Sequence, residues 1–261
     1  MSGSLAFIWE LLLMKYFHYY QLLALSLILF IFQAKAGLDF NREIYSQSEI
    51  NRIMSEMSEE SNSMSIDEFH RLRVEFHRMG NQERFNLGYE ELNALERYQR
   101  DAYQQIREGL STGYLDEETE KLVRAIDSAF DQGTRYQGTT FRGEGFLEPY
   151  LSEIKVGDIV SPSSYVSTSV SKSTAYVFHQ GQLSRFELSS ARHGIIIPTV
   201  RDDELEVILD RNSLFEVTAI ENSEEGLKVI YKEVLPEEVG SKPIKDMHTG
   251  EVLSAEEACA F

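Results

Sequence analysis

Residues 201–217 read RDDELEVILDRNSLFEV, and they contain two apolar segments separated by a polar turn. The first segment, residues 204–209, is the sequence ELEVIL, and the second is residues 214–217. Apolar runs bounded by turn residues indicate strands. Because successive side chains of a strand point to opposite faces, Glu204 and Glu206 are expected on the same face. The stretch therefore predicts two strands, the first of which carries a pair of carboxylates.

This carboxylate pair has two interpretations when it is considered alone. Two glutamates on a rigid strand are well placed for chemistry, because a strand holds side chains more firmly than a loop does. Glu-x-Glu is also a common tripeptide, and a solvated strand edge with two ordinary glutamates has the same pattern. On this stretch alone the surface interpretation is favoured, so function has to be argued from the rest of the chain.

Composition limits the kinds of partner that the protein can bind. The chain has 261 residues, enough for one or two domains with a sizeable core. Its 25 Lys and Arg against 43 Asp and Glu give a formal net charge of −18, which repels nucleic-acid phosphates and anionic membrane surfaces. Cys259 is the single cysteine, so neither an intramolecular disulfide nor a cysteine-based metal cluster can form. We expect no nucleic-acid partner and no stable membrane insertion.

The N-terminus has the pattern of a secretory signal peptide. Residues 14–36 read MKYFHYYQLLALSLILFIFQAKA, in which Lys15 is followed by an apolar core and then by Ala-Lys-Ala, a small-x-small cleavage site. The apolar core is shorter than the roughly 20 residues that a membrane-spanning helix needs. We therefore expect residues 1–36 to be a signal peptide, Met14 to be the true start and the mature protein to be secreted. The alternative is an uncleaved membrane anchor that joins this apolar core to the apolar stretch before Met14.

The next part of the chain has helical periodicity. Apolar residues recur at spacings of three and four, and the four helices that they predict are residues 44–60, 66–79, 89–108 and 117–132. Predicted ends come from Gly80, Gly109 and Gly133, and Asp116 is a predicted N-cap. His70 and His77 lie seven residues apart on one of these helices, but no third ligand follows at suitable spacing, so we predict no metal site.

After residue 133 the pattern changes to short alternating segments. Eight strands are predicted, at residues 139–142, 159–160, 165–169, 183–188, 195–198, 204–209, 214–220 and 229–234, with one short helix at 172–178. Helices followed by strands indicate an α+β domain, here with two packed sheets. We expect residues 37–88 to form an N-terminal helical segment, residues 89–235 the main domain, and residues 236–261 a polar, loosely ordered tail.

Two further motifs precede the carboxylate pair. Thr140-Phe141-Arg142-Gly143 places an arginine and a glycine at the end of a predicted strand, and residues 165–169 read YVSTS. The order and spacing of arginine, Ser-Thr-Ser and Glu-x-Glu are similar to those of the mono-ADP-ribosyltransferases of the cholera-toxin-like class. The resemblance extends over about residues 89–235 and includes the helices before the motifs.

The resemblance implies a bacterial toxin of the arginine-specific type. Its fold would be α+β, with N-terminal helices followed by a mixed β core of two sheets. NAD would be the substrate, an arginine of a target protein would accept the ADP-ribose, nicotinamide would be released and no metal would be needed. We also expect residues 89–235 to be the catalytic domain, the protein to be a monomer and its role to be in virulence.

The resemblance assigns different roles to the two glutamates. The bond between ribose and nicotinamide breaks through an oxocarbenium-like transition state, which a nearby carboxylate stabilises. By its position in the motif this carboxylate is Glu206, which would also bind a ribose hydroxyl. A protonated guanidinium is not a nucleophile, so Glu204 would orient the acceptor and take its proton. Relatives with Gln in the upstream position modify asparagine, so Glu204 implies arginine.

The other motif residues would bind NAD or support the site. Arg142 would contact the NAD phosphates or brace the site, and Gly143 would let nicotinamide approach the backbone. Ser167 would hydrogen-bond Glu206 or the ribose. Thr168, with Ser169, would hold the strand. Phe178 is the candidate for stacking on nicotinamide, and Tyr176 is its competitor for that role.

Two departures from the family pattern and two alternative functions remain. Residues 199–203 contain no aromatic residue to contact a target protein, and no arginine follows Phe178 closely.

An NAD glycohydrolase is one alternative, and it would need Glu206 but not Glu204. The other is a secreted binding protein that keeps the scaffold without catalysis. A secreted hydrolase is disfavoured because the chain has neither Gly-x-Ser-x-Gly nor His-Glu-x-x-His.

Overall fold

The structure is a computed structural model that describes residues 66–190, 192–197, 204–223 and 226–254. These residues belong to the second of two units into which the chain divides, residues 45–261. The predicted signal peptide, the predicted helix at 44–60 and the turn at 199–203 lie outside the described residues. No described helix is long and apolar enough to cross a membrane.

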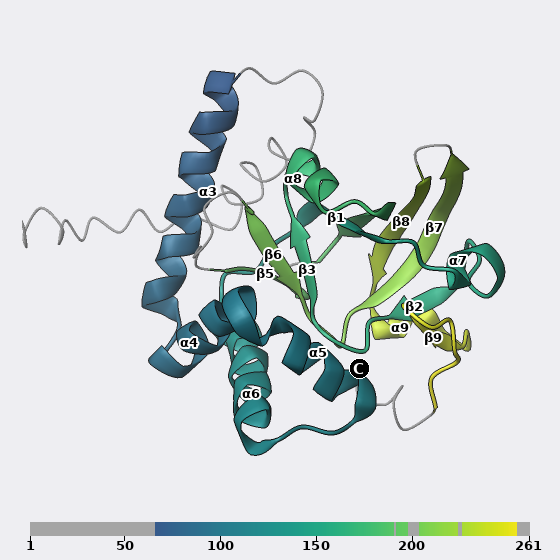
Figure 1. The fold of residues 1–261 in the computed structure, drawn as a ribbon, viewed down its shortest axis with the longest axis horizontal. Helices are drawn as coiled ribbons and strands as arrows, with labels where there is room; N and C mark the ends of the chain where they lie inside the picture. The colour runs from purple at the N-terminus through teal and green to yellow at the C-terminus, as the bar shows by residue number, and fades with distance from the viewer. Residues whose placement is uncertain (1–65, 191, 198–203, 224–225, 255–261) are drawn as a thin grey trace, which may run out of the picture. The chain divides into compact units, whose positions relative to one another are not determined.

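Helices form the first part of the described chain (Figure 1). In order they are α3 (Ile66–Asn86), α4 (Tyr89–Arg97), the π-helix η1 (Tyr98–Ala102), α5 (Tyr103–Thr112) and α6 (Glu117–Gln132). The ends predicted for α6 are confirmed. Asp116 accepts a hydrogen bond from the Thr119 amide at 2.7 Å, and Gly133 is the C-cap. The acidic first turn of α6 also suits the positive end of the helix dipole.

Two predicted helix ends are wrong, and in both cases the glycine serves packing. Helix α3 continues through Gly80, which is buried, and a Cβ there would approach the Ile197 carbonyl oxygen to 3.1 Å. Helix α5 continues past Gly109, where a Cβ would lie 3.1 Å from the Tyr114 carbonyl oxygen and overlap the Leu115 side chain. The helix ends instead at Gly113, whose φ of 71° is the left-handed conformation that glycine favours.

The second part of the chain forms one mixed sheet. Its nine strands are β1 (Gly138–Gly145), β2 (Ile159–Ser161), β3 (Val166–Ser169), β4 (Gly181–Leu188), β5 (Gly194–Ile196), β6 (Glu206–Leu209), β7 (Leu214–Ser223), β8 (Gly226–Val234) and β9 (Ile244–Asp246). Their order is β5-β6-β3-β1-β4-β8-β7-β2-β9. The pairs β4–β8 and β2–β9 are parallel. The α+β class is confirmed, but the two expected sheets are hydrogen-bonded as one curled sheet.

Three short helices interrupt the strands, and the segment after residue 235 belongs to the fold. The helices are α7 (Pro149–Ser152), α8 (Lys172–Val177) and α9 (Pro236–Val239). Strand β9 pairs with β2. Met247 after it is buried in the main core, the hydrophobic cluster that includes Phe186, Phe215 and Tyr231. The expectation of a loosely ordered tail is therefore wrong for residues 236–254, because their few apolar side chains were not a periodic signal.

Strands β5 and β6 are buried on both faces, which places them between two cores. Ile195, Ile197 and Ile208 pack against α4, α5 and α6, which Figure 1 shows gathered beside these strands. Ile196 and Val207 face the other core together with residues of β4, β7 and β8. A strand covered on both faces reads as a continuous apolar run. This explains the sequence VIL directly after Glu206.

The register of the neighbouring strands brings the three motifs together. Strand β3 pairs with β1 on one side, with Phe141 opposite Ser169. On its other side β3 pairs with β6, with Ser169 opposite Glu206 and Ser167 opposite Ile208. Arg142, the Ser-Thr-Ser motif and Glu206 thus lie on three adjacent strands, although they are far apart in sequence.

Replacing Phe186 by Ala tests the aromatic centre of the main core. Phe186 is 1% exposed, and its ring stacks on Tyr231 with centroids 4.6 Å apart. We expect a loss of about 3–5 kcal/mol in the free energy of unfolding, measured by urea denaturation. Val74→Ala, at a side chain exposed on α3, is the control and should change it by less than about 0.5 kcal/mol. Equal effects of the two changes would contradict this description of the core.

Candidate active site

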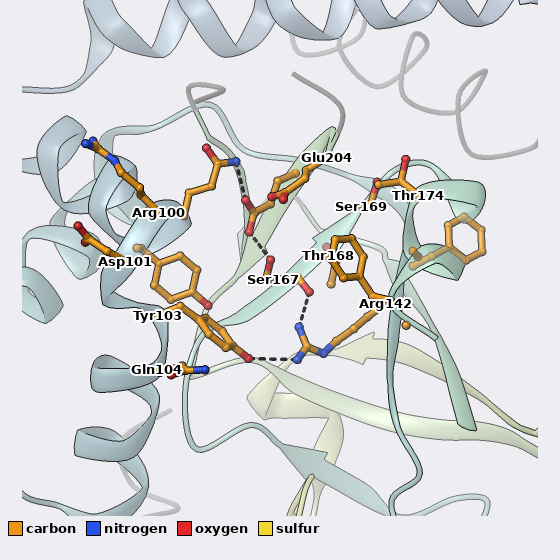
Figure 2. Close-up of a pocket in the computed structure, with 17 residues that line it drawn as sticks. Arg100, Asp101, Tyr103, Gln104, Arg142, Ser167, Thr168, Ser169, Thr174 and Glu204 are labelled. Carbon is orange, nitrogen blue, oxygen red and sulfur yellow. Dashed lines mark hydrogen bonds between the residues drawn. The ribbon is translucent and has the colours of Figure 1, made fainter. Parts of the chain in front are cut away.

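A cleft of about 540 Å³ lies between η1, the start of α5 and strands β1 and β3, with α8 at one side. Its size is within the range of ligand sites in proteins, roughly 300–1,000 Å³. All the predicted site residues line it, namely Arg142, Gly143, Ser167, Thr168, Phe178, Glu204 and Glu206. Figure 2 shows the side chains of Arg142, Ser167, Thr168 and Glu204 around the same space. The structure therefore brings the three sequence motifs into one site.

Glu206 is the most buried carboxylate of this site. Glu206 is the first residue of β6 and is only 3% exposed. The Ser167 hydroxyl donates to Oε1, and the Gln99 side-chain amide donates to Oε2 at 2.8 Å (Figure 2). Burial raises the pKa of Glu206 to about 7, the two hydrogen bonds oppose this shift, and the charge of Glu204 adds to it. The carboxylate is thus held in place from both sides.

Glu204 reaches the cleft by a different route from the one predicted. It lies in a turn before β6, which begins only at Glu206, so the two glutamates are not alternate residues of a strand. Leu205 between them has a φ of 46°, a left-handed conformation that is rare for a residue with a side chain. The Leu205 side chain is fully buried in the main core. The reversal at Leu205 lets both carboxylates line the cleft.

The Ser-Thr-Ser motif holds strands as well as the glutamate. The Thr168 hydroxyl donates to the Val207 carbonyl oxygen at 2.7 Å, which ties β3 to β6 beside Glu206. The Ser169 hydroxyl oxygen accepts from the Ser171 amide at 3.0 Å, at the start of the turn into α8. Only Ser167 of the three directs its hydroxyl to the carboxylate, which agrees with the division of roles that the resemblance implied.

Arg142 connects three parts of the site. Its Nη1 donates to the Ser167 carbonyl oxygen at 2.8 Å and Nη2 to the Tyr103 hydroxyl at 3.1 Å (Figure 2). Its Nε donates to Glu144 at 3.0 Å. Although burial raises the pKa of Tyr103, the positive charges of Arg142 and Arg107 outweigh it and lower that pKa. Arg142 therefore braces β1, β3 and α5, the second of the two tasks that the sequence suggested for it.

Gly143 is required by the packing of α8. A Cβ on Gly143 would overlap the Ala175 carbonyl oxygen and lie 2.6 Å from the His179 amide nitrogen. The end of α8 therefore rests directly on β1, and Phe178, the C-cap residue, lines the cleft with 51% of its surface exposed. Tyr176 does not line the cleft, and its ring stacks on His179 instead. The structure places Phe178, not Tyr176, where a ligand ring could stack.

Sequence reasoning missed three residues that hold the site. Gln99 binds Glu206, Tyr103 binds Arg142, and Glu144 pairs with Arg142. Tyr103 lies within the helix predicted at residues 89–108, where nothing marked it as a site residue. Glu144 stands two residues after Arg142 on the same strand, a spacing that could have identified it. Gln99 gave no signal, because a π-helix was not predicted. Among the described residues, no group of three or more His, Cys, Asp or Glu side chains could hold a metal ion.

This arrangement suits chemistry in which positive charge develops beside a buried carboxylate. Glu206 lies in the wall of an open cleft, so an electron-poor carbon placed there would be stabilised at short range and low dielectric. Glu204 is partly exposed at the same cleft, so it can exchange protons with a second reactant. Phe178 offers an exposed ring nearby.

Comparison with known proteins identifies the same region. Residues 77–237 match the family model of the ADP-ribosyltransferase exoenzymes. Among curated proteins, Mav of Mycobacterium avium, assigned by name to the NAD(+)–arginine ADP-ribosyltransferases, is 24% identical over 134 residues. The match covers 51% of this chain but 16% of Mav, so the chain spans about a sixth of that relative.

Solved structures share the fold. The ADP-ribosyltransferase Vis, a Vibrio splendidus toxin, in complex with agmatine is 21% identical, with a TM-score of 0.63 and coverage of 77% of this chain and 100% of that one. Exoenzyme S from Pseudomonas aeruginosa, in complex with human 14-3-3 protein beta and bound to carba-NAD, is 18% identical, with a TM-score of 0.53 and coverage of 73% and 92%. At these identities the likeness concerns the fold.

Replacing Glu206 by Gln should stabilise the protein more at pH 8 than at pH 5. The pKa of Glu206 is about 7 in the folded protein against an ordinary 4.5, so between these values the folded state binds more protons than the unfolded state. Stability from this group therefore falls as pH rises through that window, and the uncharged Gln removes the loss. We expect a relative gain on the order of 2 kcal/mol, measured by urea unfolding at both pH values.

The matched control for this measurement is Glu108→Gln, at an exposed glutamate of α5 that does not line the cleft. Its effect should be the same at pH 5 and pH 8. If Glu206→Gln also had the same effect at both values, the raised pKa of the buried carboxyl would be wrong.

Proposed function

The chain belongs to the ADP-ribosyltransferase exoenzyme family, and we propose that it transfers ADP-ribose from NAD to an arginine of a target protein, releasing nicotinamide. The observation that carries the proposal is the buried Glu206 carboxylate, held by Ser167 and Gln99 in the wall of a cleft that Glu204 also lines. Glu206 would serve the bond that breaks, and Glu204 would serve the bond that forms.

The bond that breaks joins the ribose C1 of NAD to the nicotinamide nitrogen. When nicotinamide leaves with the electron pair of that bond, C1 and the ring oxygen acquire positive charge. The Glu206 carboxylate must be ionised to stabilise this charge, and its pKa of about 7 keeps a large part of it ionised at neutral pH. Nicotinamide would stack on the exposed ring of Phe178, and Arg142, by donating to the Ser167 carbonyl oxygen, would keep β1 and β3 together beside the sugar.

The bond that forms joins C1 to a guanidine nitrogen of the acceptor. That nitrogen becomes a nucleophile only if a proton leaves as the bond is made, because guanidinium is fully protonated in water. Glu204 stands at the cleft within a turn, partly exposed, where an acceptor side chain can reach it. Its carboxylate would orient the guanidinium and take the proton, which is the task of a general base.

Known relatives support this choice of substrates. Mav is named for arginine as the acceptor, and the Vis structure contains agmatine, a small guanidine compound. Exoenzyme S is bound to carba-NAD. For the present chain, Glu204 in the upstream position of Glu-x-Glu supports arginine as the acceptor, and the cleft around Glu206 supports NAD as the donor.

We further propose that residues 1–36 direct secretion and that the protein acts as a monomeric toxin on a protein target. The sequence pattern at residues 14–36 supports secretion. The net charge of −18 favours a basic, arginine-bearing partner over nucleic acid. We keep the boundary of the catalytic domain near residues 89–235, although the family match begins at residue 77, within α3.

The proposal is tested by incubating the purified protein with labelled NAD in the presence and absence of agmatine. We expect label on agmatine, and Glu206→Ala should reduce both this transfer and NAD cleavage by about 10²-fold or more, because it removes the charge that stabilises the transition state. Glu108→Gln, on the exposed face of α5, should retain the rates of the natural protein.

Each other outcome of this assay selects a different function. Nicotinamide release without labelled agmatine would indicate an NAD glycohydrolase or another acceptor. The absence of any NAD cleavage in protein shown to be folded would favour the silent binding protein and reject the proposal.

Glu204→Gln tests the division of roles between the glutamates. The substitution keeps the size of the side chain but removes its capacity to accept a proton, which only the acceptor step requires. We expect transfer to agmatine to fall by about 10²-fold, within the range that loss of a general base produces, while NAD hydrolysis changes by less than about tenfold. Measuring both products in one reaction gives the ratio directly. An equal loss of the two activities would show that Glu204 serves the bond-breaking step as well.

A further inference from the structure

We propose that Gln99 is the positioning residue that fixes the Glu206 carboxylate for ADP-ribosyl transfer. This inference rests on the proposed function, because it assigns Gln99 a role in that reaction. The Gln99 side-chain amide donates to Glu206 Oε2 at 2.8 Å, and the Ser167 hydroxyl donates to Oε1. Gln99 comes from a helix and Ser167 from a strand, so the carboxylate is fixed between two separate elements of the fold.

A local change of helix type places Gln99 at the cleft. Gln99 is the second residue of η1, the five-residue π-helix between α4 and α5. A regular α-helix would spread Tyr98, Gln99 and Tyr103 over about 140° of its surface, because 3.6 residues complete a turn. Hydrogen bonds from i to i+5 widen the turn and bring residues five apart closer together on the helix surface. Accordingly the rings of Tyr98 and Tyr103 are in contact, with centroids 5.4 Å apart, and all three residues line the cleft.

The donors to Glu206 among the described residues are both neutral. Arg142, the nearby cation, donates its hydrogen bonds to Glu144, Tyr103 and the Ser167 backbone carbonyl. Of the described ionisable groups, Glu204 in the preceding turn raises the pKa of Glu206 and Arg142 of β1 lowers it, while Glu206 in turn raises the pKa of Tyr98 of η1. With so little compensation, losing one neutral donor should have a measurable effect on both the ionisation and the orientation of Glu206.

The test compares the natural protein with Gln99→Met, which keeps the length of the side chain and its helix propensity but cannot donate a hydrogen bond. The first measurement is the titration of the Glu206 carboxyl by NMR in the absence of NAD. We expect its pKa to rise by about one unit. Gln99→Asn, which withdraws the amide by one methylene, should shift it in the same direction, so the test does not depend on one variant folding well.

The second measurement is the pH dependence of NAD cleavage. We expect the acid limb of kcat to move to higher pH with the NMR value. The ionised fraction at pH 7, and kcat with it, should fall by about fivefold with little change in KM. Gln132→Met, at an exposed glutamine of α6 that does not line the cleft, is the control and should match the natural protein in both measurements.

The outcomes separate this inference from the proposed function. An unchanged Glu206 titration in both Gln99 variants would overturn it. A higher KM with an unchanged kcat and acid limb would also overturn it, because Gln99 would then bind NAD rather than position Glu206. If the natural protein did not cleave NAD at all, the proposed reaction would fail, while a shifted titration would still establish that Gln99 holds the carboxylate.

Discussion

The burial of one carboxylate is the constraint on which the site depends. Glu206 is 3% exposed, and a buried charge is tolerated only when hydrogen-bond donors replace the water that it has lost. One donor, Ser167, comes from β3, and the other, Gln99, comes from η1. A shift of one residue in the β3–β6 register would turn Ser167 to the other face of the sheet and leave the carboxylate half satisfied. Glu206 therefore depends on the β3–β6 register, which places Ser167, and on the π-helical geometry of η1, which places Gln99.

The backbone before β6 bears part of the cost of this arrangement. A left-handed conformation at a residue with a side chain costs on the order of 1–2 kcal/mol, and Leu205 adopts it with a φ of 46°. Two interactions offset the strain, since its side chain is fully buried in the main core and its carbonyl oxygen accepts from the Val170 amide at 3.2 Å. A glycine would relax the backbone but lose the core contact. By anchoring its side chain in the core, Leu205 therefore fixes the backbone that carries Glu204 at the cleft.

The sequence could predict the strands and their motifs, but not the contacts that depend on two elements meeting. Ser167 and Glu206 were found because each lies in a motif with fixed chemistry, and α6 was placed correctly because its capping signals are local. Gly80 was misread as a helix end because a close approach to β5 leaves no trace in the local pattern. Gln99 was missed for a related reason. A π-turn is stabilised by what its residues touch in the folded protein, and its five-residue step is invisible to a search for 3.6-residue periodicity.

Arg142 shows why the site behaves as one unit. Three of its five N–H groups are used inside the protein, and they reach Glu144, the Ser167 carbonyl and the Tyr103 hydroxyl. A lysine has a single ammonium group and could not span these three directions. The Ser167 carbonyl oxygen accepts from Arg142 while its hydroxyl donates to Glu206, so a movement of the arginine is passed to the Glu206 carboxylate through one residue. The position of Glu206 is therefore set from β1, through Arg142 and Ser167, as well as from η1, through Gln99.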